Sequence, residues 1–472
     1  MKYAVGLWAL LLITLVRQVE AQSFYFGADL SYVNEMEDCG AVYKAGGEAK
    51  DPYAMFKDYG CNLVRLRLWH TPSWYDALND GNRYSDLADV ANSISRAKAQ
   101  GMDVLLDFHL SDTWADPGHQ VVPAAWAAVV NNQTLLADSL YNYIYATLAS
   151  LGDQGLFPDI VQIGNETNRG ILLSQAVNDQ GWTLDWNRNV ALFQAAQNAI
   201  DAIELTYSTT IKSAIHIADP EDVEWYVEQF VANGFTAFDI IGISYYWQWH
   251  QPITFAQVGD VVSRLKQNYP GKNVMLFETA YGWTTQNADA ANNILFNTYP
   301  GYSPLSSDNQ KKWMIDLTQE VIDNGGSGIV YWEPAWVSTG CSTQWAQGSS
   351  WDNATFFDFN DEVQEEGGIG WMTHPYDFIL STEDDSDLSE SISFQYADGG
   401  IMITVPDNVR LTYPCRFRMY SLDGKLMQSV SIASREEMMG NRIAVSSILP
   451  GIYLGTIEDA NSKNFSGKIV HY

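Results

Sequence analysis

The sequence contains few positive charges. Its 472 residues include 26 Lys and Arg against 57 Asp and Glu, which gives a formal net charge of -31 at pH 7. Such an acidic chain repels the phosphates of nucleic acids, whose binding depends on Lys and Arg. We therefore expect no nucleic-acid partner, whereas a neutral ligand and a soluble extracellular protein fit this charge.

Cysteine is also scarce, and the chain has only Cys39, Cys61, Cys341 and Cys415. Their spacing is not that of a zinc site, whose ligands come in closely spaced pairs. Disulfides can form in an exported chain. Four cysteines allow several pairings, and the sequence does not choose among them.

Beyond the N-terminus, no apolar run is long enough to cross a membrane. Lys2 and the apolar run Tyr3–Val16 precede the small residue Ala21. The run is shorter than the roughly 20 residues of a transmembrane helix, and the pattern is typical of a signal peptide. We assign residues 1–21 to a signal peptide, and because no Cys follows the run, no lipid anchor is indicated. We therefore predict a monomer without a transmembrane segment, either secreted or on the cell surface.

Aromatic residues, by contrast, are abundant, with 17 Trp and 26 Tyr. Flat rings can stack on the apolar faces of sugars while their polar edges stay hydrated. Packing in the core is the alternative, and we expect most of these rings to lie there.

Eight short apolar segments alternate with helical patterns in the first part of the chain. The spacing of apolar residues predicts a helix over Ser85–Ala99, for example, which Gly101 closes. Near-continuously apolar strands that alternate with helices are typical of a parallel sheet, and eight of them of a (β/α)8 barrel. The predicted strands are Phe24–Leu30, Leu63–Trp69, Asp103–His109, Ile160–Ile163, Ser213–Ile217, Phe238–Tyr245, Asn273–Glu278 and Gly328–Trp332.

The composition changes after these segments. Residues 381–391 are rich in Ser and Asp and predict an acidic linker. Residues 392–472 show the alternation and turn signals of β-strands. We therefore predict an α/β fold, with a (β/α)8 TIM barrel over residues 22–380 and a small C-terminal all-β sandwich over residues 392–472.

Two of the predicted strands run into a glutamate. The fourth is followed by Gly164, Asn165 and Glu166, and the seventh ends in Glu278. The carboxyl ends of barrel strands share one face, so these side chains can meet. Retaining glycosidases use two carboxyl groups roughly 5 Å apart, one as acid/base and one as nucleophile. The pair therefore favours sugar chemistry, although an Asn-Glu dipeptide alone is common at a polar turn.

Longer motifs narrow this interpretation. They are Gly27–Tyr32, Leu63–Trp69, His109–Gly118, Gly164–Glu166, Ile243–Tyr246, Glu278–Gly282, Tyr331–Trp336, Trp351–Ala354 and Phe357–Phe359. In this order, from Phe24 to about Phe359, they resemble the endo-β-1,4-galactanases of glycoside hydrolase family 53. The resemblance implies a retaining enzyme that hydrolyses β-1,4-galactosidic bonds in the galactan and arabinogalactan side chains of pectin.

The resemblance also implies roles for individual residues. Glu166 would be the general acid/base and Glu278 the nucleophile, with Arg67 beside Glu278 to lower its pKa. Asn165 would hold the substrate 2-hydroxyl, and Tyr245 would hydrogen-bond the nucleophile. The pKa of Glu166 should be raised relative to that of Glu278. The cleft would be lined by His109, Asp112, Trp114, Trp332 and Trp336.

Several of these residues also have a structural interpretation. Arg67 could form a salt bridge inside the barrel, and His109 could be a histidine of the core. Trp114 and Trp336 could serve packing alone. Glu333 is a third glutamate at a strand end, but Pro follows it, and we assign it to the scaffold.

A loop after the seventh strand carries oxygen-bearing side chains at Asn287, Asp289 and Asn293. Calcium loops place such ligands at alternating positions, and the resemblance implies calcium here, because some bacterial members of the family hold it in this loop. In this chain Asn287 stands in place of the expected Asp, and Ala291 in place of the expected His. We expect no required cofactor, with one structural calcium and a plain polar loop as the alternatives.

The C-terminal region carries a second resemblance. Met419–Lys425, Leu449–Leu454 and Phe465–Val470 resemble the C-terminal sorting domain of proteins exported by the type IX system of Bacteroidetes. Such a domain is a receptor-read address. A small carbohydrate-binding module is the alternative, which the absence of Trp after Trp371 disfavours.

Two other functions remain open for the barrel. One is a different endo-glycanase of the same clan, such as a mannanase or cellulase. The order and the residues of the motifs argue against this alternative. The other is a glycan-binding barrel without catalysis. Such proteins usually lose one of the two glutamates, whereas this chain keeps Glu166 and Glu278. The expected partner is therefore a β-1,4-galactan or arabinogalactan polysaccharide.

Overall fold

The structure is a computed structural model that describes residues 24–181, 184–378, 392–397, 400–405, 411–421, 426–440, 442–444, 451–460 and 464–471. The chain divides into two compact units, of which one is Phe24–Asp377 and the other includes the described residues from Phe378 onward. The predicted signal peptide (1–21) and linker (381–391) lie outside the described residues. Within the described part, no helix is both long enough and apolar enough to cross a membrane.

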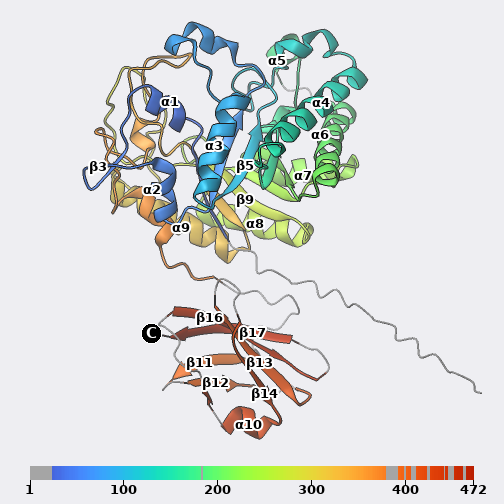
Figure 1. Ribbon diagram of the computed structural model, residues 1–472, viewed down its shortest axis with the longest axis vertical. Helices are drawn as coiled ribbons and strands as arrows, with labels where there is room; N and C mark the ends of the chain where they lie inside the picture. Colours follow the sequence, from blue (N-terminus) through green and yellow to red (C-terminus); the bar gives the residue numbers. More distant parts are fainter. Residues whose placement is uncertain are drawn as a thin grey trace, which may run out of the picture. The chain divides into compact units, whose positions relative to one another are not determined.

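Eight parallel strands close into a barrel in the first unit (Figure 1). Each strand lies beside the next in the chain, and the last pairs with the first, with Tyr25 opposite Gly328. The predicted fold class is thereby confirmed. The strands are β1 (Tyr25–Asp29), β4 (Leu63–Leu68), β5 (Asp103–Phe108), β6 (Ile160–Ile163), β7 (Lys212–Ala218), β8 (Ile240–Ser244), β9 (Asn273–Thr279) and β10 (Gly328–Tyr331).

Helices surround the barrel, and most begin at a side chain that caps the first turn. Asp86, Asn132 and Asp185, for example, accept N–H groups that the helix itself leaves unpaired. The helices are α1 (Val33–Asp38), α2 (Pro52–Asp58), α3 (Leu87–Ala99), α4 (Gln133–Gly152), α5 (Gln175–Asp179), α6 (Trp186–Tyr207), α7 (Val223–Ala232), α8 (Phe255–Asn268) and α9 (Ser307–Asp323).

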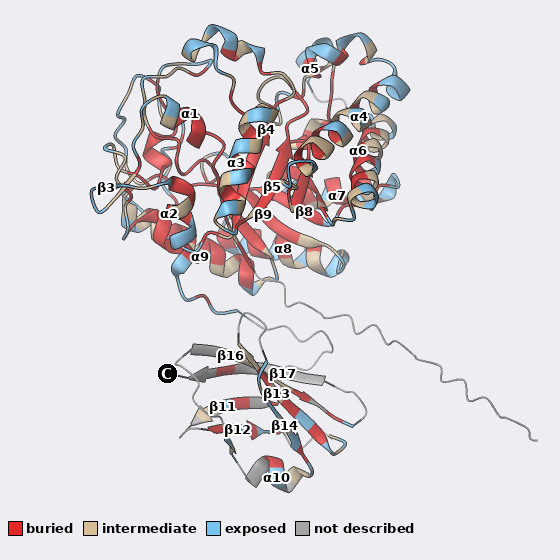
Figure 2. Cartoon of the chain, in the orientation of Figure 1, coloured by how far each residue is buried: buried red, intermediate tan, exposed pale blue. Residues whose placement is uncertain are grey.

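Shorter elements fill the loops of this unit. They are the hairpin β2 (Lys44–Ala45) and β3 (Glu48–Ala49), and the 3₁₀ turns η1 (Ser73–Ala77), η2 (Asn79–Gly81), η3 (Ala124–Val129), η4 (Thr167–Arg169), η5 (Asp352–Ala354) and η6 (Gly368–Thr373). The barrel strands are buried, whereas the helices bury one face and expose the other (Figure 2). This pattern explains why the strands are apolar almost throughout and the helices only periodically.

The interior of the barrel is filled in layers. One apolar layer takes side chains from all eight strands, namely Tyr25, Leu63, Leu105, Ile160, Ala214, Ile240, Met275, Phe277 and Val330. Side chains of a strand alternate between its faces, so residues two positions further along also point inward. On β4 to β7 these next residues are Arg65, Asp107, Gln162 and His216. The period of the strands therefore places a polar layer next to the carboxyl ends of the barrel.

The second unit contains two antiparallel sheets. One consists of β11 (Ser393–Ala397), β12 (Gly400–Thr404) and β15 (Ile443–Ala444), and the other of β14 (Leu426–Ile432), β13 (Cys415–Ser421), β16 (Gly451–Glu458) and β17 (Asn464–His471). Residues of both sheets, such as Phe394 and Phe417, share one apolar core. A short helix, α10 (Arg435–Gly440), was not expected from the all-β pattern.

Candidate active site

Arg65 forms ion pairs with three buried carboxylates of the polar layer. Its Nη1 lies 2.9 Å from Asp29 Oδ2 and 2.8 Å from Glu278 Oε1. Its Nη2 lies 2.7 Å from Asp107 Oδ2. Buried charges are stable only when they are paired and hydrogen-bonded. The guanidinium of Arg65 therefore stabilises these three carboxylates in the barrel interior.

Arg67, which we predicted beside Glu278, pairs with a different carboxylate. Its Nη1 lies 2.9 Å from Glu333 Oε1, and its guanidinium carbon lies 4.2 Å from the ring centroid of Trp114. The prediction for Arg67 was therefore wrong, and its structural interpretation, a salt bridge inside the barrel, is the right one. Arg65, two residues earlier on the same face of β4, is the cation beside Glu278.

The tyrosine that contacts Glu278 is Tyr246. Its hydroxyl donates to Glu278 Oε2 at 2.9 Å. Tyr245, which we predicted for this contact, donates instead to the carbonyl of Ile253 at 2.6 Å. The prediction was wrong by one residue, because neighbouring residues at the end of a strand point in opposite directions.

Glu166 and Glu278 line one cavity of about 820 Å³. Burial raises the pKa of both carboxyl groups. The charge of Glu278 raises the pKa of Glu166 further, whereas Arg65 and Tyr246 hold the pKa of Glu278 down. Glu166 therefore keeps its proton to higher pH, and Glu278 is the group that ionises first.

Asn165 and His109 also line this cavity. Asn165 Oδ1 accepts from Arg65 at 2.7 Å, and its Nδ2 donates to the carbonyl of Ala115 at 2.8 Å. His109 Nε2 lies 3.1 Å from Asp107 Oδ2, and its Nδ1 accepts the N–H of Ala115 at 3.2 Å. Burial lowers the pKa of His109, so the ring is neutral and donates through Nε2.

Tryptophans form the walls of the cavity. The predicted Trp114, Trp332 and Trp336 lie there, together with Trp249, Trp345 and Trp351, which were not predicted to line the cleft. Trp249 and Trp345 remain 51% and 60% exposed. Accessible indole faces of this kind suit stacking against the apolar faces of a sugar chain.

Asp112 does not line the cavity. Its carboxylate accepts the N–H groups of Thr71 at 3.0 Å and of Ala124 at 2.8 Å. It thereby joins the loops that follow β4 and β5. The prediction that Asp112 lines the cleft was wrong.

Some residues of the site were absent from the sequence-based set. They are Arg65, Asp107, Gln162, His216, Ser244 and Tyr246. Four of them share a signal that could have found them: each stands two positions after an apolar residue of the barrel interior, where a polar side chain is costly unless it has partners. The sequence contained this period, but the depth of each layer depends on how the strands are staggered.

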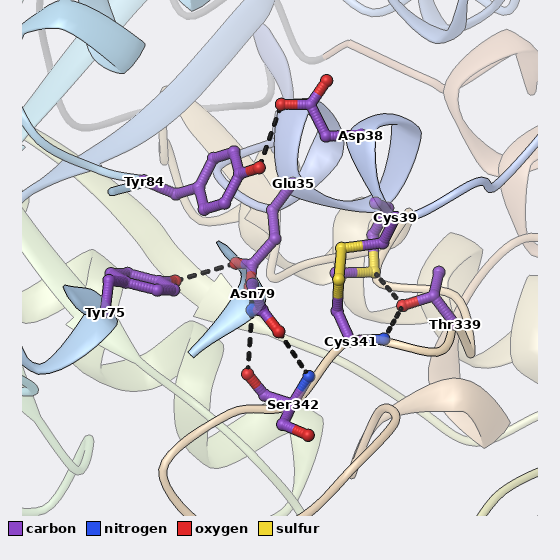
Figure 3. Close-up of a disulfide and its surroundings, with 10 residues drawn as sticks. Glu35, Asp38, Cys39, Tyr75, Asn79, Tyr84, Thr339, Cys341 and Ser342 are labelled. Atoms are coloured by element: carbon purple, nitrogen blue, oxygen red, sulfur yellow. Dashed lines mark hydrogen bonds between the residues drawn. A yellow bond between two sulfur atoms is a disulfide. The ribbon is translucent and has the colours of Figure 1, made fainter. Parts of the chain in front are cut away.

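A disulfide joins Cys39, next to α1, to Cys341 in the segment after β10 (Figure 3). The other two cysteines are free and buried. Beside the disulfide, Asn79 Nδ2 donates to the carbonyl of Ser342 at 3.0 Å, and Asn79 Oδ1 accepts the Ser342 N–H at 2.9 Å. These links anchor the segment that carries Trp345 at the rim of the cavity.

The loop that was a calcium candidate is closed by hydrogen bonds. Asn287 Nδ2 donates to a backbone carbonyl of the loop at 2.7 Å, and Asn293 Nδ2 donates to Asp352 Oδ1 at 2.6 Å. Asp289 uses both oxygens on backbone N–H groups, one of them from Ser349 at 2.6 Å. Calcium needs six to eight oxygen ligands, and no cluster of three His, Cys, Asp or Glu that could hold a metal occurs among the described residues. The carboxylate oxygens of Asp289 are thus used inside the loop, whereas Asn293 Oδ1 is buried without a hydrogen-bond partner; calcium in this loop stays a prediction.

The fold and the site together define a class of protein. A (β/α)8 barrel with two strand-end glutamates in one tryptophan-lined cavity is the arrangement of the barrel glycoside hydrolases. Residues 25–366 match the profile of glycosyl hydrolase family 53. This chain belongs to that family.

Known relatives agree with this assignment. The chain is 46% identical over 337 residues to an arabinogalactan endo-β-1,4-galactanase of Cellvibrio japonicus, covering 71% of this chain and 86% of the relative. It is 32% identical over 391 residues to an endo-β-1,4-galactanase of Bacillus subtilis, covering 73% and 85%. The solved family 53 catalytic domain of Ignisphaera aggregans superposes with a TM-score of 0.67 at 30% identity, covering 76% of this chain and 98% of that one. A fungal β-1,4-galactanase gives a TM-score of 0.61 at 27% identity, covering 74% and 98%.

Proposed function

We propose that this enzyme hydrolyses internal β-1,4-galactosidic bonds of galactan with retention of configuration. The observation that carries the proposal is the pair Glu166 and Glu278 in one cavity. Arg65 and the hydroxyl of Tyr246 oppose the effect of burial on the pKa of Glu278, whereas the charge of Glu278 adds to the effect of burial on the pKa of Glu166. The names of the relatives from Cellvibrio japonicus and Bacillus subtilis support galactan as the substrate.

The reaction proceeds in two steps. Glu278, as a carboxylate, attacks the anomeric carbon while Glu166 protonates the glycosidic oxygen, so the bond to the leaving sugar breaks and a galactosyl ester forms. Glu166, now ionised, takes a proton from a water molecule, which displaces Glu278 from the anomeric carbon. Two inversions at the same carbon give retention.

The other residues of the cavity hold the substrate. One hydrogen of Asn165 Nδ2 is used on the carbonyl of Ala115, and the second is available to the sugar 2-hydroxyl. The indoles of Trp114, Trp332 and Trp336 provide stacking faces. Since Trp249 and Trp345 are exposed at the rim, the cavity is open to a chain that extends beyond it, as an endo-acting enzyme requires.

Sequence patterns support further parts of this proposal. The substrates are the galactan and arabinogalactan side chains of pectin, and the enzyme acts on them as a monomer outside the cell. The signal-peptide pattern of residues 1–21 supports export. Residues 392–472 act as the type IX sorting address, on the motifs that they share with such domains.

The test is release of reducing sugar from β-1,4-galactan, with mannan, cellulose and xylan as control substrates. We expect release from galactan alone. Glu278→Gln should lower kcat by about 10³-fold or more, because an amide is not a nucleophile. The matched control is Glu224→Gln, whose residue lies on α7 and pairs with Arg264 on the surface, and it should retain activity.

The anomer that forms first, read by NMR, tests retention: the β-anomer supports the two-step reaction, and the α-anomer overturns it. Release from mannan or cellulose instead of galactan would assign the enzyme to another activity of the clan. A folded protein that binds galactan but releases nothing from any glycan would be a binding protein.

A further inference from the structure

Glu166 has an unusual backbone conformation. Its φ of 44° and ψ of 60° lie in the left-handed region, which residues with a side chain rarely adopt. Such a conformation persists only where the surrounding structure enforces it, and it is common at active sites. The side chains that enforce it at Glu166 can be identified from their hydrogen bonds.

Gln120 holds the carbonyl side of this turn. Its Nε2 donates to the carbonyl of Asn165 at 2.7 Å and to that of Glu166 at 3.2 Å. Successive carbonyls of an extended strand point in opposite directions, so one amide can reach both only because the chain turns here. Gln120 is 3% exposed, and its own N–H is fixed by Asn178 Oδ1 at 3.0 Å.

His216 on β7 holds the amide side. Its Nδ1 accepts the N–H of Glu166 at 3.3 Å, and its backbone carbonyl accepts from Thr167 Oγ1 at 3.1 Å. The ring is fully buried, and its Nε2 lies 2.9 Å from Ser244 Oγ. Two consecutive residues at the end of β6 are thus tied to one histidine of the neighbouring strand.

The surroundings of the ring favour the tautomer that this contact requires. Two donors face Nδ1 of His216, the N–H of Glu166 and Nε2 of Gln162 at 3.0 Å. The acceptor nearby, Asn165 Oδ1 at 3.0 Å, already accepts from an arginine. The ring proton therefore sits on Nε2 and is donated to Ser244. Burial and a neighbouring guanidinium lower the pKa of His216, which keeps the ring neutral.

We propose that His216 and Gln120 are positioning residues that hold Glu166 in its left-handed conformation and so aim its carboxyl group at the glycosidic oxygen. Neither residue lines the cavity, so both act through the residues that they hold, Glu166 and the adjacent Asn165. The inference rests on the proposed function, in which Glu166 is the acid/base. If the hydrogen bonds of either residue are removed, the backbone of Glu166 can leave its left-handed conformation. The carboxyl group then moves away from the oxygen that it must protonate.

Two amides test His216 because each retains a different part of the ring. Asn can place an oxygen near the position of Nδ1 and accept the N–H of Glu166, whereas Gln reaches the position of Nε2 and leaves that N–H unpaired. A displacement of about 1 Å can cost about 100-fold, so we expect His216→Gln to lower kcat on galactan by about that factor. His216→Asn should stay within about 10-fold of the parent, and KM within about threefold, because the tryptophan walls are unchanged.

Gln120→Glu tests the hydrogen bonds of Gln120 with a side chain of the same size. A carboxylate only accepts hydrogen bonds and would repel the two carbonyls, so we expect a similar fall of about 100-fold in kcat. Gln310 provides the matched control, since it is also fully buried and donates to a backbone carbonyl, that of Tyr281, at 2.8 Å. Gln310→Glu should lower Tm and leave kcat within about twofold.

A substrate whose leaving group needs no proton separates misplacement of Glu166 from general damage. With 2,4-dinitrophenyl β-galactobioside, the initial burst of dinitrophenolate reports attack by Glu278 alone. For His216→Gln and Gln120→Glu we expect a burst rate within about threefold of the parent beside the large loss on galactan. An equal loss in both assays, or an unchanged kcat on galactan, would overturn the proposal.

The proposal remains testable in two further ways. If His216→Gln does not fold, Gln120→Glu carries the test on its own, because it leaves the ring of His216 and the contacts of that ring in place; the same selective loss is expected. A crystal structure of His216→Gln in which Glu166 keeps its positive φ would also overturn the proposal. This structure does not depend on an activity assay. If the parent enzyme is inactive on galactan, the proposed function is contradicted, and the crystal structure still decides the role of His216.

Discussion

Arg65 on β4 and Tyr246 in the segment after β8 contact the two oxygens of Glu278. Nη1 of Arg65 lies 2.8 Å from Oε1, and the hydroxyl of Tyr246 donates to Oε2 at 2.9 Å. Both contacts favour the carboxylate and oppose the effect of burial on its pKa. At Glu166, burial and the charge of Glu278 both favour the acid. Two chemically identical side chains are thus prepared for opposite tasks by their neighbours.

Tyr246→Phe tests this division. Without the hydroxyl, the ionised form of Glu278 loses a hydrogen bond worth about 1.5 kcal/mol, so its pKa rises by about one unit. The acid limb of the pH profile of kcat/KM, which reports ionisation of Glu278, should therefore move to higher pH by about one unit, and kcat should fall about 10-fold.

Tyr245→Phe is the matched control, since it removes the same atoms one residue away, where the hydroxyl donates to the carbonyl of Ile253. It should lower stability by about 1 kcal/mol and leave the pH profile in place. A Tyr246→Phe profile that superimposes on that of the parent would contradict the assignment.

Two of the three wrong assignments, those of Arg67 and Tyr245, differ in what the sequence could have given. Arg65 and Arg67 lie on the same face of β4, and the period of the strand cannot tell which reaches the depth of Glu278, because depth depends on the stagger of the barrel. Tyr246, by contrast, stands six positions after Ile240, a residue of the barrel interior, so it continues the inward-facing period of β8 and this period could have identified it. The two glutamates were predictable because each follows an apolar run directly.

Among the elements, the segments after β9 and β10 are held together by side chains. Asp289 accepts the N–H of Ser349, and Asp352 accepts from Asn293. Because these hydrogen bonds occupy the carboxylates that would bind a cation, we expect neither EDTA nor added calcium to change Tm. Asp289→Ala should lower the free energy of unfolding by about 1–3 kcal/mol, since it leaves buried N–H groups unpaired. A Tm that rises with calcium in the parent and not in Asp289→Ala would show that the loop binds the ion.

The disulfide stabilises the same rim from the other side. Cys39 and Cys341 are 302 residues apart, so their bond closes a long loop of the unfolded chain. We expect Cys39→Ala/Cys341→Ala to cost about 2–5 kcal/mol of stability, seen as a lower Tm. A reductant should lower Tm of the parent to that of the double variant and leave the double variant unchanged. Cys61→Ala is the control, because Cys61 is free and buried; a drop of equal size there would assign the effect to packing.

The elements of the barrel were more predictable than their links. All eight strands were expected within a few residues of their bounds, because each is an apolar run between helices. The pairing of Cys39 with Cys341 could not be expected, since it depends on how the ends of the barrel meet in space. The short helix α10 was missed for a similar reason: six residues between strands give too little periodicity to detect.

At the scale of the whole molecule, the two units have separate cores. The barrel unit, Phe24–Asp377, contains every residue that lines the cavity, from His109 to Trp351. The second unit has its own apolar core, which includes Phe417 and Ile457. Each core can therefore form without the other, and the catalytic machinery is complete in the first.

Removal of residues 378–472 tests this independence and the role of the second unit together. Because the cavity is complete without them, kcat and KM on soluble galactan should stay within about twofold, with the main Tm unchanged. A sorting address contributes nothing to hydrolysis in solution, so activity on insoluble galactan should also be preserved.

If the activity of the truncated enzyme falls only on the insoluble polysaccharide, the second unit is a carbohydrate-binding module, because such a module acts by raising the local concentration of enzyme on a surface. If the truncated enzyme loses activity on both substrates, the barrel depends on the second unit for its own stability, and the independence of the two cores is contradicted.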